Sequence, residues 1–245
     1  MTRRLGTSAA ILGLLAAALT ISIAPAAGAA DPLYQAPVVG QCSDMSRAEL
    51  DLPSYAEPAV DCAGPHTAQV TAVATLPDGL AYDSPDLTEL AVETCYAAQR
   101  EATGASKLGI RLTAYAIGYF IPTPEQQAAG ARWLRCDLVL LGGTELTPLP
   151  GTLAVGKFPF KKSVSRCLAG RDFLVTTCAA KHTYRATAAI KIKEKRYPKE
   201  KAWKRIGTDR CRSATTSRTY RFSWPSKVDW KVGERALVCY TQTKK

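Results

Sequence analysis

Two histidines and eight cysteines are the residues of this chain whose chemistry depends most on spacing. Each histidine follows a cysteine by four residues: "CAGPHTAQVTAV" begins at Cys62 and contains His66, and "CAAKHTYRATAA" begins at Cys178 and contains His182. Such residues could form a metal site, a Cys–His nucleophile pair or a set of disulfides. Which chemistry applies depends on the elements that position them.

The cysteine spacing indicates a tandem duplication. Four cysteines fall in each half, and the interval of 33 residues from Cys62 to Cys95 is repeated from Cys178 to Cys211. Towards the end of the two halves, "GARWLRC" aligns with "GERALVC". Self-similarity at a fixed offset is the sequence signature of repeated structural units. The histidines therefore belong to a module that was duplicated whole.

A zinc site is one alternative for these residues. Its ligands would be Cys62, His66, Cys95 and Cys136 in the first copy, and Cys178, His182, Cys211 and Cys239 in the second. Structural zinc sites usually bring their ligands in close pairs such as C-x2-C, and the Cys-x3-His element has no second close pair beside it. We therefore expect no metal and no cofactor.

A secreted envelope hydrolase is the other alternative. A Ser–His or Cys–His mechanism needs a histidine that exchanges protons with a nucleophile, and the two histidines occupy equivalent places, as residues that order a turn would. The sequence contains no G-x-S-x-G elbow, paired-carboxylate pattern or phosphate-binding glycine loop. We expect a protein that is not an enzyme, without catalytic residues, in which His66 and His182 are structural.

Disulfides are the favoured chemistry, two in each copy. An even number of cysteines in an exported chain indicates full pairing. The eight are Cys42, Cys62, Cys95, Cys136, Cys167, Cys178, Cys211 and Cys239. Four cysteines allow three connectivities: local pairing would give Cys42–Cys62, Cys95–Cys136, Cys167–Cys178 and Cys211–Cys239. Crossed pairing, first with last, stays open.

Export is expected from residues 1–30, which combine a basic start, an apolar run and small residues of the A-x-A kind. This composition is typical of a secretory signal peptide, and the route, general or twin-arginine, stays open. Nothing after residue 30 is apolar and long enough to span a bilayer. We expect a mature protein that is secreted or lies in the cell envelope.

Hydrophobic periodicity predicts an α+β fold. Residues 70–76 and 186–192 alternate as half-buried strands do, whereas residues 84–104 and 197–216 have helical spacing, with Gly207 costing the second helix about 1 kcal/mol relative to alanine. A short strand opens each copy and two strands close it. We predict two tandem duplicated domains, each a small antiparallel sheet with one packed helix, held by disulfides.

The repeated cysteine spacing and the predicted elements give the domain boundaries. Residues 1–30 form the expected signal peptide and residues 31–141 the first domain. Residues 142–163 are rich in glycine and proline and have no sustained period, which predicts a linker. Residues 164–245 form the second, divergent copy.

A known family matches this combination of motifs. "VVGQC" at the start, "CAGPH" before an alternating strand, a cysteine in the next helix and a closing P…G-x-R-x-x-x-C together resemble the septum formation domain of exported actinobacterial proteins. Residues 38–141 carry the resemblance, and the second copy is divergent, with "CAAKH" lacking the proline and "SVSRC" lacking the glycine. The resemblance implies a role in the cell envelope and brings no catalytic residues.

Charge distinguishes the two copies. Residues 31–150 contain 6 Lys and Arg against 15 Asp and Glu, a balance of −9, and residues 151–245 contain 24 against 6, a balance of +18. A field of one sign attracts polyanions. Docking of the two copies, a basic face that keeps the protein soluble, and binding of an anionic cell-wall polymer or membrane surface all stay open. We favour binding, and expect no nucleic acid, because the chain is exported.

The expected anion contacts lie in the densest basic run, "KIKEKRYPKEKAWKRIGTDRCR". They are Lys193, Lys195, Arg196, Lys199, Lys204, Arg205 and Arg212. A second contact surface is expected in "FSWPSKVDWKVGE", at Trp224, Lys227, Trp230 and Lys231, because exposed aromatic residues next to lysines are typical of binding faces.

Overall fold

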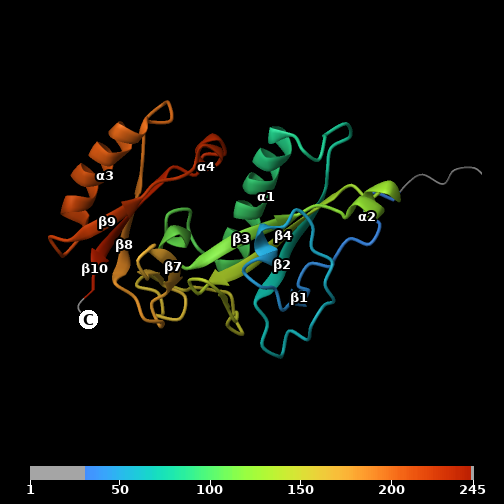
Figure 1. Cartoon of the computed structure of the whole chain (residues 1–245), viewed down its shortest axis with the longest axis horizontal. Coiled ribbons are helices and arrows are strands. Elements are labelled where there is room, and N and C mark those ends of the chain that lie inside the picture. The colour runs from blue at the N-terminus through green and yellow to red at the C-terminus, as the bar shows by residue number, and fades with distance from the viewer. Residues whose placement is uncertain (1–30, 244–245) are drawn as a thin grey trace, which may run out of the picture.

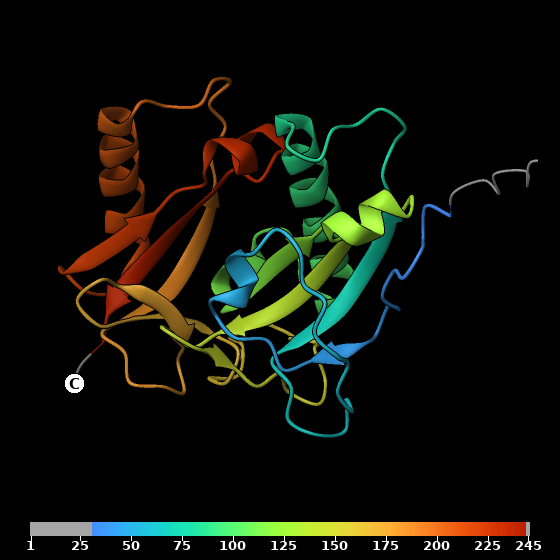
Figure 2. The same cartoon turned by 45° about the vertical axis from the view of Figure 1, so that its right-hand side comes forward.

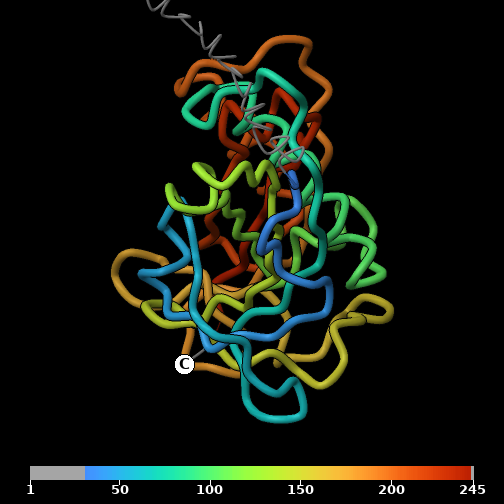
Figure 3. Tube along the Cα trace, turned by 90° about the vertical axis from the view of Figure 1, so that its right-hand side faces the viewer, coloured from blue at the N-terminus to red at the C-terminus, as the bar shows by residue number. Residues whose placement is uncertain are grey.

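The computed structural model describes residues 31–243, in which two antiparallel sheets are each packed with helices (Figure 1). The expected signal peptide, residues 1–30, lies outside the described residues. The predicted α+β fold with two similar domains is confirmed. The copies lie side by side, the first towards one end of the long axis and the second towards the other (Figure 2). Figure 3 looks along this axis from the side of the first copy.

The first copy consists of β1 (Cys42–Ser43), η1 (Glu49–Asp51), β2 (Ala68–Thr75), α1 (Pro85–Thr103), η2 (Gly109–Leu112), β3 (Tyr115–Phe120), α2 (Pro124–Ala128), β4 (Trp133–Leu141) and β5 (Leu146–Thr147). Its sheet has the strand order β1-β2-β4-β3, and β5 pairs with the end of β4. The second copy consists of β6 (Arg166–Ala169), β7 (Leu174–Thr177), β8 (Tyr184–Lys191), α3 (Glu200–Ala214), β9 (Tyr220–Ser223), α4 (Lys227–Lys231) and β10 (Ala236–Gln242).

The second sheet has the order β7-β6-β8-β10-β9. Without the extra strand β7, it repeats the first sheet, with β6, β8, β10 and β9 in the places of β1, β2, β4 and β3. Both sheets also shift register at one threonine, Thr71 in β2 and Thr187 in β8. Each threonine hydroxyl donates to the carbonyl of a bridged cysteine, Cys136 at 3.2 Å and Cys239 at 3.4 Å. The duplication therefore includes this β-bulge.

Local signals explain where the first helix begins and ends. The side chain of Ser84 accepts a hydrogen bond from the backbone N–H of Leu87 at 3.1 Å, and Pro85 occupies the first helical position. Gly104 ends the helix with φ of 63°, a left-handed conformation that favours glycine. A stripe of small and apolar residues, which includes Ala91 and Cys95, faces the sheet.

The eight cysteines form four disulfides in the local pairing: Cys42–Cys62, Cys95–Cys136, Cys167–Cys178 and Cys211–Cys239. In each copy one bridge joins the helix to the closing strand, α1 to β4 and α3 to β10. The other joins the opening strand to the turn before the second strand. Each helix is thus held covalently on one face of its own sheet.

Residues 142–163, for which we expected a linker, pack on the first copy. Leu149, Val155 and Phe160 are buried in one cluster with Tyr115. The backbone N–H of Leu149 donates to the carbonyl of His66 at 2.8 Å, and that of Val155 donates to the carbonyl of Thr103 at 3.0 Å. This segment is therefore part of the core that supports both copies.

The glycine inside α3 has a packing role. A Cβ atom on Gly207 would overlap the ring of Phe222 in β9. One turn earlier, the buried ring of Trp203 stacks on Trp224, with centroids 6.0 Å apart and planes 4° from parallel. Glycine therefore lets the helix approach β9 closely, which offsets its low helix propensity.

We predict that Gly207→Ala lowers the free energy of unfolding, although alanine is the better helix former by about 1 kcal/mol. The added methyl group would press on the Phe222 ring, and overpacking of this kind costs about 1–3 kcal/mol. Urea denaturation measures the change, and Gly207→Ala/Phe222→Leu should recover part of the loss. A Gly207→Ala variant more stable than the parent would contradict close packing of α3 on β9.

Candidate functional site

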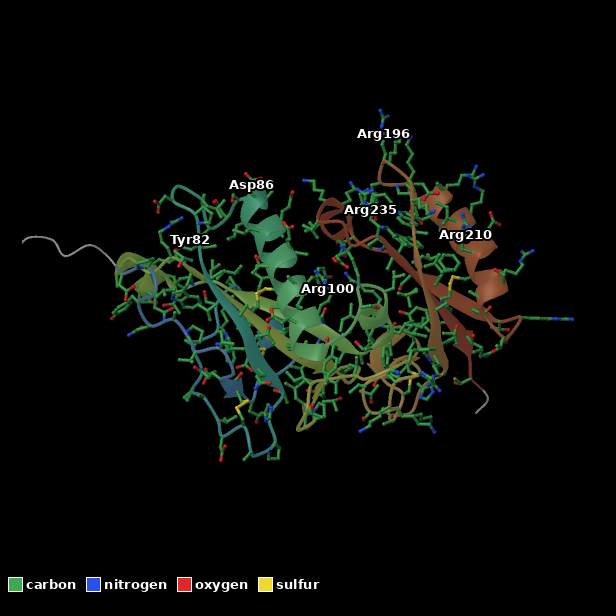
Figure 4. The ribbon with its side chains drawn as sticks, turned by 180° about the vertical axis from the view of Figure 1, so that it is seen from behind. Tyr82, Asp86, Arg100, Arg196, Arg210 and Arg235 are labelled. Carbon is green, nitrogen blue, oxygen red and sulfur yellow. A yellow bond between two sulfur atoms is a disulfide. The ribbon has the colours of Figure 1, made fainter. Side chains whose placement is uncertain are left out.

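Residues 191–212, at the end of β8, in the next loop and in α3, contain 10 of the 24 Lys and Arg of residues 151–245. Figure 4 shows Arg196 on this loop and Arg210 on α3. All seven residues expected from the sequence to contact anions have exposed side chains: Lys193, Lys195, Arg196, Lys199, Lys204, Arg205 and Arg212. We call them, together with the groove described next, the basic face. Among these seven, an ion pair in the described residues involves Lys204 alone, which lies 2.7 Å from Glu200.

A groove of about 530 Å³ lies where β8 ends and the loop to α3 begins. Four basic residues line it, together with Ile190, Ile192 and Glu194: Lys191, Lys193, Lys195 and Arg210. Sequence analysis did not name Lys191 or Arg210 as contacts, although both lie in the same basic run. The side chain of Arg210 is exposed, one residue before the buried Cys211.

The packing of α3 determines which residues form this face. Trp203, Gly207 and Cys211 are buried, and the bridge from Cys211 to β10 fixes the rotation of the helix about its axis. Side chains between these positions must therefore point away from the sheet, as Arg205 and Arg212 do.

The first turn of α3 is unfavourable for an isolated helix. Lys199 occupies the N-cap position without a side-chain hydrogen bond to the backbone, and Lys201 follows in the first turn. A cation at a helix N-terminus opposes the helix dipole. Both helices carry an acidic residue in the first turn, Asp86 in α1 and Glu200 in α3, but α1 also has the capping side chain of Ser84. Helix stability therefore does not explain the lysines of α3.

The second expected contact surface is corrected by the structure. Trp230 is 5 % exposed and packs edge-on against Trp203, with centroids 5.7 Å apart, under the guanidinium of Arg235. Trp224 is half-buried and stacks on Trp203, and Lys231 is paired with Glu89. Lys227 is exposed. The tryptophans are core residues because the loop folds into α4, which turns Trp230 inwards.

The two histidines make the same contact in both copies. The Nδ1 atom of His66 lies 2.9 Å from the carbonyl oxygen of Gly64, and that of His182 lies 2.7 Å from the carbonyl oxygen of Ala180. In each case the ring closes the turn that follows a bridged cysteine. This geometry agrees with a structural role copied together with the turn.

The cysteines of the alternative zinc site are engaged with one another. Cys62 is bonded to Cys42, and Cys95 is bonded to Cys136. In the second copy Cys167, Cys178 and His182 place one ligand atom each within 4.8 Å of the others. The two sulfur atoms of that group form a disulfide, so they could act as thiolate ligands only after reduction.

The copies meet around one buried carboxylate, Glu234, which is 2 % exposed. Its oxygens lie 2.9 Å from Arg100, 3.1 Å from Lys107 and 2.9 Å from Arg111. All three cations belong to the acidic copy and the carboxylate belongs to the basic copy. The local charges at this junction are therefore the reverse of the net charges of the copies.

Helix α4 of the second copy contacts α1 of the first beside this carboxylate. The hydroxyl of Tyr96 donates to Asp229 at 2.7 Å. Burial raises the pKa of Tyr96 to about 12, so the hydroxyl keeps the proton that it donates. Lys231 pairs with Glu89 of α1. When Cys95 is aligned with Cys211, Glu89 and Tyr96 of α1 correspond to Arg205 and Arg212 of α3, which are exposed residues of the basic face. The side that α1 uses for contact is therefore left open on α3.

We predict that Glu234→Gln lowers the free energy of unfolding by about 2 kcal/mol, because it removes charged hydrogen bonds and leaves Arg111 without its carboxylate. Urea denaturation measures this loss. Glu200→Gln is the matched control, because it breaks an exposed pair with Lys204 and should change little. Similar small losses in both variants would contradict the role of Glu234 at the junction.

In the part of the chain described here, no helix has the length and apolarity needed to cross a bilayer. Four disulfides are typical of proteins in oxidising compartments outside the cytoplasm.

Comparison with curated proteins and with solved structures found no match. A family model described as septum formation matches residues 40–239, which include both copies and the segment between them. The chain therefore belongs to the Septum formation family.

Proposed function

We propose that this chain is a secreted, non-enzymatic binding protein of the cell envelope, linked to septum formation or the cell wall. Its second copy contacts an anionic polymer or membrane surface through the basic face. The observation that carries the proposal is the set of seven exposed cations on α3 and its preceding loop, of which Lys204 alone has an acidic partner in the described chain.

The placement of the lysines supports a binding role over simple solubility. A charged face that serves solubility mixes the two signs and follows the preferences of the helix. Here Lys199 and Lys201 oppose the helix dipole at the start of α3. Places where a sequence departs from local stability rules are expected at functional sites.

The contact between the copies supports the same proposal, because it does not use the basic face. The junction is made by Glu234, Asp229 and Lys231 of the second copy. The cations of α3 point elsewhere, so docking of the copies and binding of an anionic surface can occur together. This arrangement leaves the basic face open to an external partner.

We predict that residues 31–245 bind vesicles rich in phosphatidylglycerol, or isolated cell-wall material, in a salt-sensitive way. Lys193→Gln/Lys195→Gln/Lys204→Gln/Arg212→Gln should weaken binding at least tenfold, because each basic residue near an anionic surface contributes about 1 kcal/mol. Co-sedimentation at low and high salt measures the affinity, and vesicles of phosphatidylcholine report binding that does not depend on charge.

The matched control removes four exposed basic residues of the same copy that lie outside the basic face: Arg171, Lys181, Arg218 and Lys227. This variant has the same net charge as the first and should retain most of the binding. Equal loss in both variants, or no binding of the parent at low salt to either material, would overturn the proposal.

A further inference from the structure

A second concave site lies on the face of the second sheet opposite α3. Along β10 the side chains alternate: Leu237 and Cys239 pack with Trp203 of α3, whereas Val238 and Tyr240 pack on the other face. These last two residues are part of the wall of a pocket of about 400 Å³. The pocket is separate from the basic face because the sheet lies between them.

The connection that packs on this face differs between the two copies. In the first copy the chain between β1 and β2 covers the corresponding face, where Met45 and Tyr55 pack against Phe120. The bridged cysteines of this connection are 20 residues apart in the first copy and 11 in the second. The shorter connection forms the hairpin of β6 and β7 and leaves part of the sheet uncovered.

The residues on this face have also changed in character. In the first copy, Arg135 and Asp137 of β4 form a buried ion pair at 2.7 Å. Aligned on the bridged cysteines of β4 and β10, their counterparts are Val238 and Tyr240. A buried ion pair in one copy is thus replaced by buried apolar and aromatic side chains in the other. The hydroxyl of Tyr240, 3.2 Å from that of Ser223, adds a polar group on this face.

Three arginines line the pocket, against one acidic residue, Asp229. Arg111 is neutralised by Glu234. Arg166 donates from Nε to the carbonyl of Thr113 at 2.9 Å, and its two terminal nitrogens form no ion pair in the described residues. The pocket therefore carries an excess of positive charge beside apolar side chains.

Arg221 is the most accessible of these cations. Its guanidinium lies 3.2 Å from the centre of the Phe173 ring, and its side chain is exposed. Within residues 31–243 no carboxylate lies within ion-pairing distance of it. Asp229 does not fill this role, because it accepts from Tyr96 and from the backbone N–H of Ser226.

We propose that this pocket binds a small organic anion, a carboxylate or phosphate attached to an apolar ring. Arg166 and Arg221 hold the anionic group, since a guanidinium matches the two oxygens of either anion. The ring lies against the half-buried apolar side chains of the lining, which include Phe173, Val175 and Trp224. A pocket of this size, with convergent cationic groups beside apolar side chains, lies in the size range of small-molecule sites.

The probe is 8-anilinonaphthalene-1-sulfonate, an aromatic anion whose fluorescence rises on binding, titrated into residues 31–245. We expect one saturable site per chain. Arg221→Gln should weaken it at least tenfold and lower the melting temperature only slightly, because this side chain is exposed and loses a cation–π contact with Phe173. Arg218→Gln, an exposed arginine outside the pocket, should leave binding unchanged.

Competition identifies the chemistry. Benzoate or phenyl phosphate should displace the probe, and the competitor that does so at the lower concentration assigns the anionic group. Inorganic phosphate should require a much higher concentration, and benzyl alcohol should not displace the probe. Equal displacement by benzyl alcohol, or unchanged binding by Arg221→Gln, would overturn the inference. The four-residue variant of the basic face should bind the probe normally; loss there alone would assign the probe to the basic face and reject the pocket.

Discussion

The covalent bond between each helix and the closing strand of its sheet is the constraint on which the rest of the structure depends. Cys95–Cys136 and Cys211–Cys239 fix which side of each helix faces the core. Each bridged strand cysteine accepts a hydrogen bond on its carbonyl from the bulge threonine of the neighbouring strand. Once the rotation of the helix is fixed, its outward residues follow directly from the sequence.

The outward sides of the two helices differ in what they contact. The outward side of α1 carries Glu89 and Tyr96, which contact α4 of the second copy. The same side of α3 carries arginines, and within residues 31–243 it makes no such contact. Duplication therefore left one helix face joined to the neighbouring copy and one open. On the opposite face of the second sheet, where the connection between bridged cysteines is shorter, a pocket is lined by three arginines.

Sequence analysis predicted the fold and the basic face because both depend on local patterns. Cysteine spacing and apolar periodicity identified the repeated module, and the basic run placed its cations on one helix and the segment before it. The burial of Trp230 was missed, although Ser226 and Asp229 form a capping box that indicates a helix. The role of Glu234 and the pocket at Arg221 could not be predicted, because they depend on how residues far apart in the chain come together.

Hydrogen–deuterium exchange of residues 31–245, with and without an anionic envelope polymer such as isolated teichoic acid, tests most directly the claim that equivalent helices have different roles. The account predicts slower exchange in the presence of polymer at residues 191–212 and unchanged exchange at residues 85–103, because the first helix is already engaged by α4. Equal slowing in both helices, or slowing confined to the first copy, would contradict it.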